Sequence, residues 1–421
     1  MNGTPIERIF NRLSIAGLCA TSVGNGLGRF AFVALMPALI QAGWFSKADA
    51  SWLGVATLVG YVAGASLANA LAARLSSAWL LRAAMLGCAL SFFACAIQGA
   101  GMPWFWFWRT AAGVCGAILM VLPAPVVLPR HATSIRARTS GVVFSGIGLG
   151  AAASGFLVPL FIAAGPELSF LHLQGVTATW LGLGIVCLAL TAVAWRAWPA
   201  DAPDVASPDA APQLPGDVRL TVLLILVAHG LNAIGYLAHT MFLPDYVVRE
   251  LGMPLSAGGF FWSMFGLGAA IGPMLTGTLA DVFGLRRCLL AGFLLKSLAA
   301  ILPVWSSAPV ALLISAILMG VCTPGVVALV SAYALECVGP RHHRRAWGLA
   351  TSSFAIAQAA GGALMAFAAA RLPSYHALFC VSAVALLGST ACVVLIRDHA
   401  RAEERPANAD PLPVPTTAST P

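Results

Sequence analysis

The stretch 277-GTLADVFGLRR-287 separates two long apolar runs of the chain. Gly277 allows a helix end to pack closely, and Gly284 permits the chain to reverse. Asp281 can accept hydrogen bonds from backbone N–H groups at a neighbouring helix N-terminus. Arg286 and Arg287 would follow just past a membrane edge, where cationic side chains hold a loop on the cytoplasmic side. The stretch predicts a short charged turn between two membrane helices.

The composition excludes a soluble globule. Charged residues make up 9% of the chain and hydrophobic residues 59%, whereas charged residues are about 25% of an ordinary soluble domain. The net charge is +8, but the basic residues are scattered between apolar runs without a basic face, so nucleic-acid binding is not expected. The cysteines lie inside apolar runs without metal-ligand spacing, which indicates small core residues. No cofactor and no metal site are expected.

Apolar stretches of about 20 residues are each long enough to cross a hydrocarbon layer of roughly 30 Å. They predict an all-α integral membrane protein with twelve spans. The expected spans are 14–41, 49–72, 79–100, 104–128, 140–164, 173–196, 219–243, 255–280, 287–305, 308–333, 346–370 and 375–396.

The distribution of the 23 basic residues predicts the orientation. With the N-terminus inside, only Lys47, Arg249 and Arg371 fall outside. Arg29, Arg109 and Lys296 lie within spans, and every other basic residue is cytoplasmic. Because cytoplasmic loops carry the excess of Lys and Arg, both termini are expected in the cytoplasm and the protein in the inner cell membrane.

The domain organisation follows from the spans. Residues 1–198 form an N-terminal half of six helices and residues 218–398 a C-terminal half. Between them, 199–217 is rich in proline and aspartate without helical periodicity, which predicts a flexible cytoplasmic linker. The polar, proline-rich residues 399–421 predict a disordered cytoplasmic tail.

The two halves repeat one another at a nearly constant offset. Asn25-x-x-Gly28-Arg29, followed by Pro37, corresponds to Asn232-x-x-Gly235-Tyr236, followed by Pro244. Further matches in the same order are Gly64 with Gly272, Gly113-Val114-Cys115 with Gly320-Val321-Cys322, and Pro129-Arg130-His131 with Pro340-Arg341-His342. The sequence therefore predicts two pseudo-symmetric six-helix bundles related by a parallel repeat.

These features resemble the major facilitator superfamily of secondary transporters, whose signature cytoplasmic loop is similar to G-x-L-A-D-x-x-G-x-R-R. The sequences Gly26–Ala31 (GLGRFA) and Phe242-Leu243-Pro244 are similar to its YbfB/YjiJ-like branch. The resemblance implies a transporter rather than an enzyme, with a site near the midplane between the halves and a conformational-switch loop at Gly277, Asp281, Gly284, Arg286 and Arg287. In the first half, Ala73 and Ala78 stand where the repeat places the acid and the first arginine, so this role should fall on the second-half copy.

Arg29 is the most informative single residue, because it lies about 15 residues, or roughly 22 Å of helix, into the first span. A charge at that depth is costly and faces a wet cavity, a partner or a substrate. Asn25 lies one turn earlier on the same face, and Gly26 and Gly28 make local unwinding feasible. We interpret Arg29 as an anion-attracting group of the cavity wall. The alternative is a structural arginine satisfied by carbonyl groups.

On the seventh span, His229, Asn232, Tyr236 and His239 recur at helical spacing and form one polar stripe. The repeat and the resemblance predict that this stripe lines the cavity and faces Asn25 and Arg29. Histidine titrates near neutral pH, so His229 or His239 is a candidate for the coupling proton. The alternative for either histidine is interhelical hydrogen bonding.

Three further positions carry weaker signals. Arg109 opens an arginine-glycine pattern similar to that of the family, which favours the cavity, but neighbouring tryptophans also allow it to reach the interface. Gln358 is a candidate cavity donor. Lys296 is expected to pair locally or face a crevice on a peripheral helix. The glycines at 146, 148, 150 and 155 resemble an antiporter-type motif or allow close helix packing.

Three buried cations without a mid-membrane acid favour an anionic or polar solute. We therefore expect a monomeric, proton-coupled secondary transporter of a small organic solute whose partners are that solute, protons and the lipid bilayer. One alternative is a broad-specificity efflux permease for amphipathic compounds. Another is a transport-inactive sensor or scaffold on the same fold.

Overall fold

The structure is a computed structural model that describes residues 6–164, 175–199 and 219–396. In this part of the chain, twelve helical segments are long and apolar enough to cross a membrane. Their boundaries lie close to the predicted ones, so the expected number and placement of spans are confirmed. Most of the predicted linker and the whole predicted tail lie outside the described residues.

The first bundle contains six spans. Its elements are α1 (Arg12–Thr21), η1 (Ser22–Leu27), α2 (Ala31–Gln41), α3 (Lys47–Ala72), α4 (Ser77–Cys95), α5 (Met102–Val121), α6 (Pro123–Val127), η2 (Leu128–Arg130), η3 (Thr133–Ile135), α7 (Arg136–Ala163) and α8 (Gly175–Trp195). The first span is α1, η1 and α2 in succession, and the fourth ends through α6 and η2.

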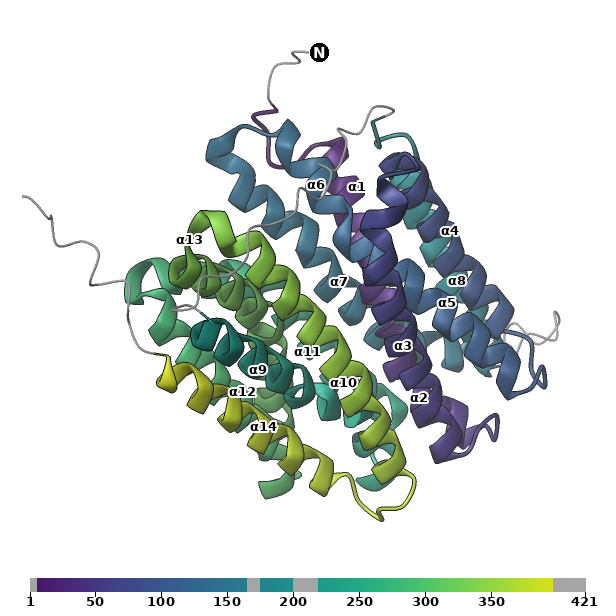
Figure 1. Ribbon diagram of the computed structural model, residues 1–421. Helices are drawn as coiled ribbons and strands as arrows, with labels where there is room; N and C mark the ends of the chain where they lie inside the picture. The colour runs from purple at the N-terminus through teal and green to yellow at the C-terminus, as the bar shows by residue number, and fades with distance from the viewer. Residues whose placement is uncertain (1–5, 165–174, 200–218, 397–421) are drawn as a thin grey trace, which may run out of the picture.

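The second bundle contains the other six. Its elements are α9 (Arg219–Gly235), α10 (Leu237–Asp245), η5 (Tyr246–Glu250), α11 (Leu255–Phe283), α12 (Leu285–Trp305), α13 (Pro309–Ala369) and α14 (His376–Leu395). The long α13 comprises two spans, because Gly339 leaves helical geometry with φ 71°. Figure 1 shows this bundle, coloured teal to yellow, lying beside the purple and blue first bundle.

We call the end of the molecule where α1 begins and α14 ends the terminal face, and the opposite end the distal face (Figure 1). The halves repeat in three dimensions as well as in sequence. A Cβ on Gly113 would collide with the backbone at Thr57, and one on Gly320 would collide with the backbone at Phe265. Each glycine thus lets two helices of its own bundle touch, α3 and α5 or α11 and α13. The predicted repeat is confirmed at the level of helix contacts.

The first span and its repeat partner, the seventh span, are both broken at mid-length. In the first, η1 is a π-helical segment and Gly28 to Phe30 form a turn. In the other, the α-helix stops at Gly235 and restarts at Leu237. A Cβ on Gly28 would lie 2.9 Å from the carbonyl oxygen of Val23, so this turn requires glycine. The local unwinding expected from Gly28 is confirmed, and it frees backbone groups near Arg29.

Glycines also bring the two bundles together. A Cβ on Gly148 or Gly155 of α7, or on Gly259 or Gly266 of α11, would approach backbone atoms of the opposite helix to under 3.0 Å. Helices without side chains at these points can pack backbone to backbone. The glycine seam, defined by these four residues, joins one half to the other, and the close-packing interpretation of the α7 glycines is confirmed.

The turn at 277–287 is partly as predicted. Gly284 has φ 87°, a conformation that glycine adopts readily, so the reversal is confirmed. Arg286 donates to the carbonyl oxygens of Val394 and Ile396, both at 3.1 Å, and so ties α12 to the end of α14. The expectation for Gly277 is wrong, since a Cβ there would meet nothing within 4 Å. Asp281 is exposed, and its carboxylate accepts no hydrogen bond from the described part of the chain.

Candidate functional site

Arg29 lies at the break of the first span and reaches the other bundle. Its Nη2 donates to the hydroxyl of Tyr236 at 2.9 Å. Its guanidinium carbon lies 4.9 Å from the ring centroid of Phe30 and 5.8 Å from that of Tyr236. Because Tyr236 is the repeat partner of Arg29, the two equivalent positions meet on the axis between the bundles. The prediction that Tyr236 faces Arg29 is confirmed.

Gln358 completes this contact from the second span of α13. With its amide oriented so that the oxygen faces the guanidinium, the oxygen accepts from Arg29 Nη2 at 2.7 Å and Nη1 at 2.9 Å, and the amide nitrogen donates to Tyr236 at 3.1 Å. We call Arg29, Tyr236 and Gln358 the central triad. It joins three helices and two bundles through one guanidinium.

Arg109 lies in α5, and 1% of its surface is exposed. Nη1 donates to the carbonyl oxygen of Gly28 at 3.0 Å, and the guanidinium lies 4.7 Å from the ring centroid of Phe32. Burial shows that the side chain does not extend to the interface, which was the alternative left by the neighbouring tryptophans. Its Nε and Nη2 have no hydrogen-bond partner among the described residues.

Arg29 and Arg109 line one pocket between the bundles. The other walls are mostly apolar and aromatic. The lining also includes Phe32, Val33, Met36, Ala50, Ser51, Gly54, Thr57, Leu58, Thr240, Met241 and Phe242. A cavity volume of about 20 Å³ accepts on the order of one water molecule. The pocket is therefore small in this conformation and carries two guanidinium groups on a mostly apolar wall.

Lys296 is a third buried cation and lies beside this network. Its Nζ donates to Asn232 Oδ1 at 2.6 Å and lies 5.3 Å from the ring centroid of Tyr236. The expected local pairing is confirmed. Sequence reasoning placed Lys296 on a peripheral helix and did not foresee that it would contact two residues of the predicted cavity stripe. No ion pair involving Arg29, Arg109 or Lys296 occurs among the described residues.

The polar stripe does not face Arg29 as a whole, and that part of the prediction is wrong. Asn232 contacts Lys296, while His239 Nε2 lies 2.7 Å from Ser315 Oγ inside the second bundle. His229 packs 4.7 Å from the ring of Phe354, centroid to centroid. The α-helix is interrupted at Tyr236, and the neighbours of the polar side chains are residues of the second bundle, namely Lys296, Ser315 and Phe354.

Asn25 also remains within its own bundle. It is buried, and its Nδ2 donates to the carbonyl oxygen of Gly116 at 3.4 Å. This bond links the π-helical segment to α5, next to the pocket that Arg109 lines. Substrate contact by any of the predicted cavity residues stays a prediction.

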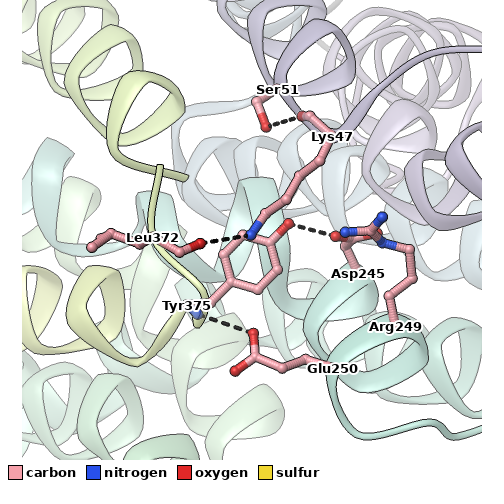
Figure 2. Close-up of polar contacts among 7 residues, drawn as sticks. All are labelled: Lys47, Ser51, Asp245, Arg249, Glu250, Leu372 and Tyr375. Atoms are coloured by element: carbon pink, nitrogen blue, oxygen red, sulfur yellow. Dashed lines mark hydrogen bonds and ion pairs between the residues drawn. The ribbon is translucent and has the colours of Figure 1, made fainter. Parts of the chain in front are cut away.

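A second polar cluster lies at the distal face. It comprises Lys47, Asp245, Arg249, Glu250 and Tyr375, with Ser51 and Leu372 beside them (Figure 2). Lys47, from the first bundle, donates to the carbonyl oxygen of Leu372 at 3.4 Å, and its Nζ lies 4.1 Å from the Tyr375 ring centroid. Tyr375 donates to the buried carboxylate of Asp245, which also pairs with Arg249 at 2.9 Å. We call this set the distal cluster.

Within the distal cluster, Lys47 joins the first bundle to Leu372 and Tyr375 of the second. Tyr375 lies outside the spans. Burial is the main cause that raises the pKa of its phenol, and the charge of Asp245 raises it further. The hydroxyl therefore keeps its proton and remains a hydrogen-bond donor. Glu250 accepts from the backbone N–H of Tyr375 at 3.0 Å and fixes the loop before α14. Sequence reasoning missed the cluster, although the four-residue spacing of Asp245 and Arg249 was a usable signal.

Comparisons with known proteins agree with this architecture. Residues 21–394 match a family model described as uncharacterised MFS-type transporter YbfB. No curated protein sequence matches.

Two solved structures show the same fold. A bacterial homologue of the human lysosomal transporter Spinster, in an inward-facing and occupied conformation, has a TM-score of 0.66 at 16% identity, covering 90% of this chain and 93% of that one. A point mutant of the nucleoside transporter NupG has a TM-score of 0.68 at 13% identity, covering 91% of this chain and 99% of that one. The chain is a multi-pass membrane protein and belongs to the YbfB-like MFS-type transporters of the major facilitator superfamily.

Proposed function

We propose that the protein moves a small organic anion across the inner cell membrane by alternating access, with Arg29 and Arg109 attracting the anionic group. The observation that carries this proposal is the pair of guanidinium groups that line one pocket between the bundles. Two donors of Arg109 have no partner among the described residues. A buried donor without a partner is costly, and a bound carboxylate would satisfy it.

The charge balance supports the same solute class. Arg29, Arg109 and Lys296 lie within spans, whereas Asp49, Asp245, Glu250, Asp281 and Glu336 lie toward span ends. An uncompensated cation inside a membrane protein favours a negatively charged ligand. The apolar walls of the pocket favour an anion with an apolar body.

The position of the central triad supports alternating access. The guanidinium of Arg29, from the first bundle, binds Tyr236 and Gln358 of the second bundle, so a solute that competes for Arg29 would loosen the contact between the bundles. Such rocking of two repeats about a midplane site is typical of the fold. We place the terminal face in the cytoplasm because most basic residues lie on that side in the predicted topology.

Proton coupling is a further part of the proposal, with His229 and His239 as carriers. Both are buried within the seventh span, His229 before its break and His239 after it. Histidine can accept and release a proton, and a bound proton offsets the charge of an anion that moves with it. Uptake should therefore rise between about pH 8 and pH 5. Uptake that is independent of pH over this range in the parent would contradict histidine coupling.

A thermal-shift screen of the purified full chain tests the solute class. Organic anions such as benzoate, neutral metabolites and lipophilic cations would be compared, because a ligand that binds the folded state raises its melting temperature. We expect shifts from anions that disappear in Arg29→Gln. Shifts from lipophilic cations alone would overturn the anion proposal and favour an efflux permease.

A further inference from the structure

A groove on the surface of the first bundle lies between α4 and α8, near the terminal face. It has a volume of about 350 Å³ and is lined by Leu86, Leu188, Thr191, Ala192, Trp195 and Arg196. This volume is within the range of about 300–1,000 Å³ for ligand sites. It is separate from the central pocket, which other helices line.

The walls of the groove suit an acyl chain. Leu86, Leu188 and Trp195 are each 40% exposed although they belong to membrane-spanning helices. Side chains exposed on the outside of a span contact lipid, not water, in a bilayer. Trp195 is at the end of its span, where indole rings occupy the headgroup level.

The rim of the groove is cationic. Arg82 donates through Nε to the carbonyl oxygen of Trp195 at 2.9 Å, and its guanidinium lies 5.4 Å from the Trp195 ring centroid. This geometry fixes the guanidinium beside Trp195, which lines the groove, and its terminal nitrogens donate no hydrogen bond to any of the described residues. Exposed Arg196 follows Trp195 directly. The sequences of α4 and α8 contain no acidic residue that could neutralise the two arginines.

We propose that this groove binds an anionic phospholipid, with Arg82 and Arg196 holding the phosphate and Leu86 and Leu188 contacting an acyl chain. Basic pockets between helices on the cytoplasmic side of a membrane bind anionic headgroups. Arginine supplies planar, paired donors for a phosphate oxygen. The site is independent of the solute site and of the direction of transport.

Native mass spectrometry of the detergent-purified full chain tests the proposal. Phosphatidylglycerol would be titrated against phosphatidylcholine with the same acyl chains. We expect the parent to prefer phosphatidylglycerol and the double variant Arg82→Gln/Arg196→Gln to bind it on the order of 30-fold more weakly, from the contribution of two basic residues near a membrane. Arg219→Gln, an exposed arginine at the same face of the other bundle, is the matched control and should bind as the parent does.

Two further measurements distinguish a site for a whole lipid from a site that binds the phosphate group alone. Leu188→Trp keeps both arginines but fills the groove, so it should also weaken phosphatidylglycerol binding while the melting temperature stays near that of the parent. Glycerol phosphate, which lacks acyl chains, should not displace the lipid. Equal binding of phosphatidylglycerol by the parent and the double variant, no preference over phosphatidylcholine, or displacement by glycerol phosphate would each overturn the proposal.

Discussion

Tyr236 contacts Arg29 and Gln358, which belong to two other spans. Its hydroxyl accepts from Arg29 at 2.9 Å and, with the amide of Gln358 oriented toward the guanidinium, from Gln358 at 3.1 Å. A hydrogen bond to a charged group contributes about 1.5–3 kcal/mol. The hydrogen bonds with Tyr236 and Gln358 therefore orient the Arg29 side chain before a solute binds.

Tyr236→Phe should keep the ring and remove the orienting hydroxyl. We expect anion affinity to fall about tenfold, corresponding to roughly 1.4 kcal/mol, in the same binding assay that detects the parent ligand. Tyr246→Phe is the matched control, because its hydroxyl bonds to the carbonyl oxygen of Pro303 inside the second bundle. An affinity loss of the same size in both variants would show that the effect is not specific to the central triad.

Lys296 and Asn232 allow a test of buried charge. Asn232→Leu leaves the ammonium without its hydrogen-bond acceptor and should destabilise the protein by about 1.5–3 kcal/mol. Lys296→Met removes the charge at similar volume and should leave the melting temperature unchanged or higher. The double variant Asn232→Leu/Lys296→Met should recover most of the loss. Additive losses in the double variant would contradict this account of the pair.

At the scale of elements, the glycine seam holds α7 against α11 through backbone contact. Gly266→Ala should lower the melting temperature, because its Cβ would approach Ala152 of α7 to under 3.0 Å. Gly277→Ala, on the same helix, meets nothing within 4 Å and should be neutral or stabilising by up to about 1 kcal/mol. Equal melting temperatures for the two variants would show that the seam is not tightly packed.

Apolar length and the internal repeat were sufficient to predict twelve spans and their pairing, since both properties are local or periodic in the sequence. The contact between Arg29 and Tyr236 was also predictable, because repeat-related positions near the axis face each other. The contacts of His229, His239 and Asn232 were not, because they depend on which side chains of α12 and α13 pack against the seventh span. The pairing of Lys296 depends on how α12 packs, which no local pattern encodes.

At the scale of the whole molecule, the distal cluster connects the bundles through Lys47. Lys47→Gln should weaken this contact by roughly 1 kcal/mol, the usual contribution of a partly exposed charge or cation–π pair. We expect hydrogen exchange to rise about fivefold in the distal loops that contain Ser46 and Tyr375, as a loss of that size implies, and to stay unchanged at the terminal face.

Arg371→Gln is the matched control for Lys47→Gln. Arg371 is an exposed distal cation whose guanidinium lies 3.5 Å from the ring centroid of Phe367 in its own bundle. Its substitution should leave exchange in the loop before α3 as it is in the parent. Unchanged exchange in Lys47→Gln would show that Lys47 does not hold the distal ends together.

Uptake by proteoliposomes tests the central claim most directly, namely that Arg29 binds the transported anion between two moving bundles. The anion with the largest thermal shift would be supplied in radiolabelled form, with an inward proton gradient, to vesicles containing the parent or Arg29→Gln. The account predicts uptake by the parent and none above protein-free vesicles for Arg29→Gln, with both proteins folded and inserted equally. Equal uptake by the two proteins would contradict it.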